Sequence, residues 1–360
     1  SMSTPSRQFL HRLLNAPGPS GFELGPARIW RTEAETFAEV RVDANGNSYA
    51  TSGPRTASRA RPSRLMFAGH IDEIGVMVTH VDEEGFLYFD PIGGWDTQIF
   101  VGQRVVLLGR GGEVAGVIGK PAIHLMKPEE REKASKVTDL WIDIGAANRA
   151  ETLERIRVGD AGVLASTVQE FPNGRLVSRS IDNRAGAYVV LEALRLLAVD
   201  PPEVEVTAVA TTQEEISHSG GGARPSAQGL EPVAAVVVDV THATDYPGAE
   251  KKRHGEVKLG GGPVLTRGSA VSPVVFEMLL AAAEAEGIPY MLSAAPRATG
   301  TDADAIFTSH RGIPTGLVSI PNRYMHSPNE MVVWDDLEAA ARLLAAFARR
   351  VTPDLDFVPR

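Results

Sequence analysis

Two adjacent carboxylates, Glu214 and Glu215, are the residues of this chain with the clearest potential for chemistry. They close a run of apolar and β-branched residues that starts at Val204, a pattern typical of a buried strand. Neighbouring anions repel each other and lose hydration when buried, so a positive charge must compensate them. If that charge is a metal ion, one glutamate can bind it while the other acts as a general base on the activated water. The alternative for the pair alone is a strand that runs out into solvent.

Four further segments carry residues that can bind metals, at the ends of predicted strands or at the start of a predicted helix. Such positions are where α/β folds place their sites. In the first segment, His70 and Asp72 project to the same face of an extended chain. This spacing suits a histidine ligand and a carboxylate that fixes its tautomer or steers the attacking water. A structural role is the alternative for such a pair.

The other three segments contribute two aspartates and a histidine. Asp182 precedes a predicted helix, so it either caps that helix or bridges two metal ions about 3.5–4 Å apart. Asp239 lies in an apolar strand, where an unpaired charge is rare. His242 is interpreted as a local hydrogen-bonding residue, and His326, taken alone, as a loop histidine. The order His, Asp, Glu-Glu, Asp, His nevertheless matches the ligand set of a dinuclear hydrolase.

Composition restricts both the metal chemistry and the partners. The 360 residues carry a formal net charge of -9, which argues against general binding of nucleic acid or anionic membranes. Because the chain has no cysteine, a metal must be held by His, Asp and Glu, which suit zinc, cobalt or manganese. No apolar run approaches the roughly 18 residues of a membrane span. The N-terminal residues lack the apolar core of a signal peptide, so we expect a cytoplasmic protein.

The elements that position these residues indicate an α/β domain. After Asp182, predicted helices alternate with predicted strands, which is typical of a layered sheet covered on both faces. The helices are expected at 184–197, 272–286, 302–310 and 334–349, and the strands at 204–211, 233–240, 289–293 and 314–320. Before this region we expect helices at 7–14 and 23–37, a hairpin at 40–53 turning at Asn45-Gly46, and a strand at 64–70.

Between about Val76 and Thr167 the pattern changes. Short apolar pieces alternate with glycine-rich turns, and helical periodicity is weak apart from a short stretch at 147–156. His70 precedes this region, and the other candidate residues follow it. We therefore expect one α/β domain, residues 1–75 and 168–360, interrupted by an inserted β-rich domain, residues 76–167.

The motifs together resemble the glutamyl or deblocking aminopeptidase family of co-catalytic metallopeptidases, the tetrahedral aminopeptidases, whose members have also been labelled cellulases or endoglucanases. The resemblance covers essentially the whole chain and rests on the ordered motifs NAPGPSGFE, AGHIDEIGVMV, RSIDNRAGAY, TTQEE, DVTHATDYPG, GTDADAI and PTGLVSIPNRYMHSPNEMV. It implies a layered α/β/α metallopeptidase domain with an inserted small β-barrel-like domain for oligomerisation or access. Such relatives commonly form dodecamers whose active sites face an inner cavity, and they bind zinc or cobalt.

The resemblance also implies a role for each candidate residue. Glu214 would be the general base, and Asp72 would orient His70. The implied ligands of two divalent ions are His70 with Asp239 at one site, Glu215 with His326 at the other, and Asp182 as the bridge.

One segment departs from the family pattern. After Glu215 the chain reads Ile-Ser-His-Ser-Gly, where relatives usually carry a Gly-Leu-Arg-Gly type stretch. His218 either lines the substrate pocket or is a solvated loop residue. Further along, Thr301 and Asp302 are candidate substrate-binding residues, although Asp302 is equally a candidate N-cap for the helix that follows.

We therefore expect a metal-dependent aminopeptidase that acts on short peptides through a water activated by two metal ions, in a homo-oligomer such as a dodecamer. A glycosidase is one alternative, but it needs two carboxylates facing each other across a sugar, about 5–9.5 Å apart. The adjacent Glu214 and Glu215 have no reason to take that geometry. A non-catalytic assembly or binding protein on the same fold is the other alternative, and such a chain should have lost a ligand or the base.

Overall fold

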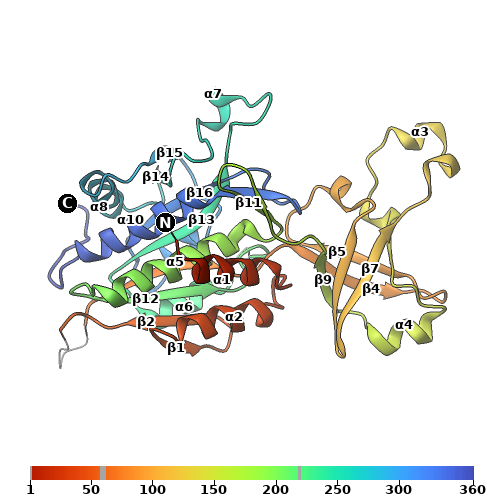
Figure 1. Cartoon of the computed structure of the whole chain (residues 1–360), viewed down its shortest axis with the longest axis horizontal. Helices are drawn as coiled ribbons and strands as arrows, with labels where there is room; N and C mark the ends of the chain where they lie inside the picture. Colours follow the sequence, from red (N-terminus) through yellow and green to blue (C-terminus); the bar gives the residue numbers. More distant parts are fainter. Residues whose placement is uncertain (1, 57–61, 218–219) are drawn as a thin grey trace.

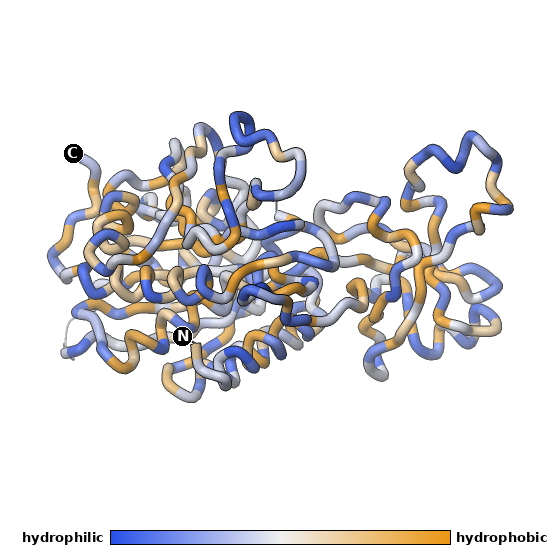
Figure 2. Tube along the Cα trace, turned by 45° about the horizontal axis from the view of Figure 1, so that its top comes forward, coloured by the Kyte–Doolittle hydropathy of each residue, from blue (hydrophilic) through white to orange (hydrophobic). Residues whose placement is uncertain are grey.

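A computed structural model describes residues 2–56, 62–217 and 220–360. These residues form a layered α/β unit from which a closed β-barrel projects to one side (Figure 1). The prediction of a layered α/β/α domain with an inserted barrel is confirmed. Hydrophobic residues run through the interior of both units, and hydrophilic residues gather on the outer loops (Figure 2).

The α/β unit is built on an eight-stranded sheet in the order β1-β2-β12-β3-β13-β16-β14-β15. The four central strands β12, β3, β13 and β16 run parallel, and the expected hairpin forms the antiparallel pair β1–β2, with Gly46 at φ +83° in its turn. The strands span β1 Glu39–Val42, β2 Ser48–Ser52, β3 Arg64–His70, β12 Glu205–Thr211, β13 Ala234–His242, β14 Val264–Gly268, β15 Met291–Ala295 and β16 Thr315–Asn322.

Helices cover both faces of this sheet. In β3, Leu65 and Phe67 pack into the large core on one face, whereas Met66 and Ala68 pack into a smaller core on the other. This alternation follows from the two-residue period of a strand. The helices on the large-core face are α1 Thr4–Asn15, α2 Leu24–Ala34, α5 Ile181–Val199, α8 Pro273–Ala285 and α10 Trp334–Arg349, and those on the small-core face are α6 Ala223–Leu230 and α9 Ala303–Ile306. The short α7, Lys251–His254, is exposed. No helix in the described ranges is long and apolar enough to cross a bilayer.

The barrel closes in the order β4-β5-β8-β7-β6-β9 around a core of its own that includes Phe89, Phe100 and Leu107. Its strands are β4 Gly75–Val81, β5 Leu87–Ile92, β6 Arg104–Gly109, β7 Gly112–Gly119, β8 Trp141–Asp143 and β9 Ala161–Leu164. Its short helices are η1 Thr97–Phe100, η2 Ile123–Leu125, α3 Pro128–Arg131, η3 Val137–Asp139 and α4 Arg149–Arg155, the last within the expected stretch 147–156. A separate three-stranded sheet consists of β10 Gln169–Phe171, β11 Arg175–Ser178 and β17 Glu330–Val333.

Two predicted elements affect the site, and one of them differs from the structure. The strand expected at 204–211 is β12, which ends at Thr211 as predicted, so Glu214 and Glu215 lie on a turn beyond it. The helix expected at 302–310 is limited to Ala303–Ile306, because the chain turns at His310, which has a left-handed φ of +54°, to enter β16.

Candidate metal centre

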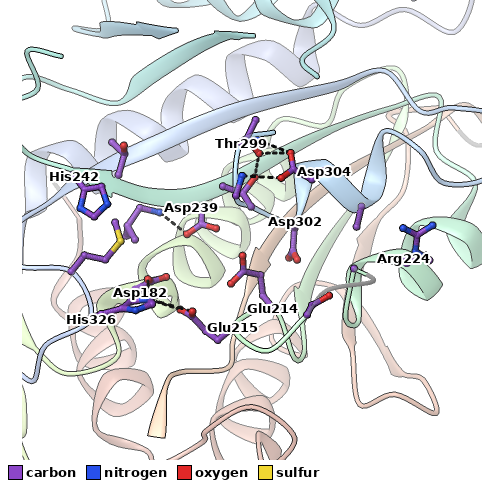
Figure 3. A pocket seen from close by; sticks show the side chains of 18 residues that line it. Asp182, Glu214, Glu215, Arg224, Asp239, His242, Thr299, Asp302, Asp304 and His326 are labelled. Atoms are coloured by element: carbon purple, nitrogen blue, oxygen red, sulfur yellow. Dashed lines mark hydrogen bonds and ion pairs between the residues drawn. The ribbon is translucent and has the colours of Figure 1, made fainter. Parts of the chain in front are cut away.

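A cavity of about 630 Å³ opens at the carboxyl ends of the central parallel strands (Figure 3). Acidic and histidine side chains from segments far apart in the sequence converge on it, as expected for the carboxyl edge of such a sheet. The titratable residues that line it are Asp182, Glu214, Glu215, Arg224, Asp239, His242, Asp302, Asp304 and His326. His70, buried beneath this edge at the last position of β3, contacts several of them.

The His70 ring is fixed on one side and unsatisfied on the other. Its Nδ1 lies 3.1 Å from the carbonyl oxygen of Asp72 and 3.2 Å from Oδ1 of the same residue. Because a carbonyl can only accept, Nδ1 carries a proton that it donates to Asp72. The buried Nε2 lies 3.2 Å from oxygens of both Asp182 and Glu214, yet none of the described residues forms a well-oriented hydrogen bond with it. A nitrogen lone pair that converges with carboxylate oxygens suits a divalent cation.

His326 reaches the same carboxylates from the opposite side. Its Nε2 lies 3.1 Å from Oδ2 of Asp182 and 3.2 Å from Oε2 of Glu215. Asp182 therefore directs one oxygen toward His70 and the other toward His326, which is the arrangement a bridging carboxylate requires. Figure 3 shows Asp182, Glu215 and His326 grouped together, with Asp239 and Glu214 beside them.

Among the described residues, possible ligand atoms form two groups, within each of which all atoms lie within 4.8 Å of one another, and both groups contain His70. One group adds Glu214 and Asp239, and the other adds Asp182 and Glu215. The sites implied by the family resemblance differ from these groups, since they assign Glu214 to catalysis and include His326. The contacts of His326 favour its inclusion as a ligand. Its Nε2 lies 3.1 Å from Asp182 and 3.2 Å from Glu215, which matches the 3.2 Å between the Nε2 of His70 and Asp182.

Close packing of glycines brings Asp182 to this place. A Cβ on Gly69 would lie 2.4 Å from the carbonyl carbon of Gly186, so glycine allows α5 to lie directly against the end of β3. Asp182 and Asn183 depart from helical geometry, and Asn183 Nδ2 donates to the Val238 carbonyl oxygen at 2.8 Å. The interpretation of Asp182 as a simple helix cap is therefore wrong: its side chain faces the two histidines.

Side chains from three distant segments hold the turn that carries the two glutamates. The backbone N–H groups of Glu214 and Glu215 donate to Oδ1 and Oδ2 of Asp72, at 3.1 and 3.0 Å. The N–H of Gln213, a residue in the left-handed region at φ +61°, donates to Glu23 Oε1 at 3.1 Å. The N–H of Thr212 likewise donates to the side chain of Asn47. Asp72 thus contacts the ring of His70 and the backbone of both glutamates.

Burial makes the acids of the centre difficult to ionise without a cation. Desolvation raises the pKa of Glu214 to about 10, opposed by His70 and reinforced by Asp239 and Glu215. Desolvation also raises the pKa of Asp239 well above its usual range. Burial opposes protonation of His326, but Asp182 and Glu215 outweigh it and raise the histidine pKa to about 11. Divalent cations would relieve this excess of acids over histidines.

The candidate substrate-binding residues lie on the other side of the cavity. Thr301 and Asp302 line it, but Asp302 does not use its side chain to cap α9 and instead accepts a hydrogen bond from Thr211 Oγ1 at 2.5 Å. Asp302 does occupy the N-cap position of α9, as the alternative had it, but the side chain that accepts the Ala303 N–H is that of Thr301. His242 lines the cavity, and burial lowers its pKa. His218 lies outside the described residues.

Several contributing residues have no signal in the sequence. Glu330 is buried and accepts hydrogen bonds from the Asp182 N–H and the Asn322 side chain. Asp304 holds the cavity wall by accepting the N–H groups of Thr299 and Gly300. Both acids act by accepting backbone or amide N–H groups of residues brought near by folding, which residue type alone does not reveal.

Comparisons with known proteins identify the family of this chain. The family model of the M42 glutamyl aminopeptidases matches residues 46–343. The lysyl aminopeptidase of Pyrococcus furiosus is 31% identical over 357 residues, covering 98% of this chain and 99% of that protein. A crystal structure of a TET aminopeptidase from Thaumarchaeota archaeon SCGC AB-539-E09 superposes with a TM-score of 0.89 and 33% identity over 97% of each chain. The TET1 peptidase of Pyrococcus horikoshii, which can assemble into a tetrahedron or a large octahedral shell, has a TM-score of 0.84 and 29% identity over 96% of this chain and 100% of its own. The chain therefore belongs to the M42 glutamyl aminopeptidase family of peptide hydrolases.

Proposed function

We propose that this protein is a dinuclear metallo-aminopeptidase that removes the N-terminal residue from short peptides. The observation that carries the proposal is the position of Asp182, whose two oxygens face the Nε2 atoms of His70 and His326. Each histidine thereby marks one half of a two-ion centre. Membership of a peptidase family supplies the class of substrate.

The ligand set fits two divalent ions, with zinc and cobalt as the candidates. His70 and Asp239 would complete one site, Glu215 and His326 the other, and Asp182 would bridge them. The fit rests on the buried, unpartnered Nε2 of His70 and on a donor set of imidazoles and carboxylates. When bound, such ions lower the pKa of a water and polarise a peptide carbonyl.

Glu214 is assigned as the general base. Its Oε2 lies 3.2 Å from the Nε2 of His70, at the edge of the cavity. There it accepts a proton from the attacking water and passes it to the departing amine, so that the peptide bond is replaced by a carboxylate and a free amine. Asp72 acts through its contacts, since it fixes the His70 ring and holds the backbone of Glu214 and Glu215.

The remaining cavity wall would bind the substrate. Asp302 is a buried acid near Glu214 that lies outside both groups of possible ligand atoms, so a substrate ammonium is a suitable partner for it. Thr301 precedes Asp302 and also lines the cavity. His218, three residues after Glu215 in the sequence, is a further candidate for substrate binding. Net charge of -9 disfavours nucleic acid as a partner.

We assign residues 1–75 and 168–360 to the catalytic domain and residues 76–167 to an inserted domain for assembly or access. Ile123 and Leu125, which are 59% and 82% exposed on the barrel, supply apolar surface for contact between copies. The shells formed by the Pyrococcus horikoshii TET1 peptidase support a homo-oligomer, and the dodecamer in the solved structure of PhTET1-12s supports a dodecamer as one form.

Hydrolysis of a panel of aminoacyl amides by metal-reconstituted protein, with and without chelator, tests the proposal. Glu214→Gln should keep the metal content while kcat falls by about 10²–10⁴, since the amide cannot take a proton. Glu33→Gln, in an ion pair with Arg195 outside the cavity, is the matched control and should keep its activity.

Near-normal turnover by Glu214→Gln would refute the assigned base. If metal-loaded wild type cleaved no member of the panel, the non-catalytic binding protein on this fold would be the better interpretation.

A further inference from the structure

One loop of the inserted barrel reaches the metal centre. After β5 ends at Ile92, the chain leaves the barrel through Gly93, Gly94 and Trp95, a segment we call the Gly-Gly-Trp loop. The carbonyl oxygen of Gly94 lies 2.7 Å from Nδ1 of His326, a residue 232 positions later in the chain. A Cβ on Gly93 would lie 3.5 Å from the Cβ of Glu215. The loop therefore contacts both residues that would complete the second metal site.

This contact fixes how His326 faces the carboxylates. A carbonyl oxygen can only accept, so Nδ1 of His326 carries the proton and Nε2 is left to face Asp182 and Glu215. His326 is on a turn with a left-handed φ of +58°, and its side chain is 30% exposed. Its ring is thus less confined by packing than that of His70, whose side chain is 1% exposed.

The two histidines are therefore held by different domains. The orienting acceptor of His70 is Asp72, three residues before the barrel begins at Gly75. The orienting acceptor of His326 is a backbone group of the barrel region itself. Partners of this kind set the tautomer and direction of a ligand histidine, and their loss typically weakens metal binding by about 10–100-fold.

We propose that the Gly-Gly-Trp loop is a positioning element for the metal site of Glu215 and His326, so that the inserted barrel completes one of the two sites. This inference rests on the proposed dinuclear function. It gives the barrel a role inside the catalytic centre, in addition to assembly or access.

The loop is built to keep its carbonyl in place. Gly93 has a φ of +81°, and a Cβ there would lie 2.5 Å from Cγ2 of Ile74, so this position needs glycine. Trp95 Nε1 donates to the carbonyl oxygens of Gly75 and Ile92, at 3.0 and 3.2 Å. The Trp95 ring also packs on Phe100, with the centroids 4.5 Å apart. Any shift of Gly93 must therefore move the Gly94 carbonyl.

Titration of Co²⁺ into the metal-free full-length protein, followed by calorimetry and visible absorption, tests the inference. Gly93→Ala should retain one Co²⁺ with wild-type affinity and bind the second about 10–100-fold more weakly. Gly102→Ala is the matched control, because its φ of +76° carries the same backbone strain and no atom lies within 4 Å of its Cβ. This control should bind both ions like wild type.

Trp95→Phe is the second variant and decides the question if Gly93→Ala does not fold. It removes the indole N–H and keeps the packing on Phe100, so it should weaken the second Co²⁺ selectively but less strongly. Two ions bound by Gly93→Ala and Trp95→Phe with unchanged affinities, or equal weakening of both ions, would overturn the inference and leave the proposed function standing. A wild-type protein that binds fewer than two ions would overturn both. Selective loss of the second ion supports the inference even if no aminoacyl amide is cleaved.

Discussion

Replacing Glu73 by leucine should destabilise this protein strongly, although Glu73 touches no candidate metal ligand. The residue follows Asp72 and is buried between two arginines. Its Oε1 accepts a hydrogen bond from Arg179 Nε at 2.5 Å, and its Oε2 accepts from Arg184 at 2.7 Å and from the Gly18 N–H at 3.0 Å. Arg179 and Arg184 are both buried as well, so the three side chains form a charged network inside the fold.

The expected loss follows from the charges that would be left behind. Removing one partner of a buried ion pair costs about 3–5 kcal/mol, because the other charge stays buried without compensation. An unfolding entropy of about 2.1 cal/mol/K per residue gives about 0.76 kcal/mol/K for 360 residues, so Tm should fall by about 4–7 °C. Arg184 keeps its hydrogen bonds to the carbonyl oxygens of Ile71, Leu13 and Ala16, which favours the lower end of that range.

Glu33→Leu supplies the matched comparison. Glu33 pairs with Arg195 at 2.6 Å, but the two side chains are 19% and 32% exposed. Partly solvated pairs contribute about 0.2–1 kcal/mol, so Tm should fall by about 1 °C or less. Differential scanning calorimetry of the metal-free proteins measures both shifts. A Glu73→Leu protein that unfolds at the same temperature as Glu33→Leu would refute the reasoning from buried charge.

Three further predictions concern the centre and its surroundings. Burial, with a contribution from Asp72, raises the pKa of Glu23 from 4.5 to about 7, so the stability from its neutral form is complete below pH 4.5 and lost as pH rises through 7. The difference in Tm between Glu23→Gln and wild type should therefore shift by about 3 °C in favour of the variant between pH 5 and pH 8 in calorimetry. A Tm difference that stays constant with pH would contradict this prediction. Co²⁺ at about 100 times its Kd should stabilise wild type by about 2.7 kcal/mol per site, reversibly with chelator, and His70→Ala should lose most of that gain in calorimetry. Asp302→Asn should lower kcat/KM for aminoacyl amides by about 10–150-fold by removing a charge-assisted hydrogen bond to the substrate ammonium, and unchanged kinetics would exclude Asp302 from substrate binding.

The buried central strands could be predicted closely from the sequence. The expected strand at 64–70 coincides with β3, because a parallel strand covered on both faces consists of apolar residues almost throughout. In contrast, α6 was not predicted, since its eight residues include Pro225 and Gly229, and its buried face consists of small side chains. The strand β14, which lies between β16 and the edge strand β15, is not predicted either, because five residues bounded by glycines carry too short a pattern.

The candidate ligands could be identified for a related reason. Asp239 in the middle of β13 is an acid at a position where an apolar residue is usual, so its type conflicts with its surroundings and makes it visible in the sequence. Asp182 at the start of α5 carries no such conflict, because aspartate also caps helices, and it stands out only through the ordered motifs around it. Their partners could not be found in this way: Asp72 holds the turn through backbone N–H groups, and Glu23 does so from 190 positions away.

The sequence by itself determined which donors are present, their order along the chain and the class of chemistry that imidazoles and carboxylates without cysteine can support. The tertiary structure decided how those donors are oriented. It places one oxygen of Asp182 toward each histidine and a carbonyl of the barrel region against His326. The physical reason is that every residue carries the same backbone groups apart from the missing proline N–H, so the pairing of a given N–H or C=O leaves no trace in residue type. It arises when segments far apart in the chain pack together.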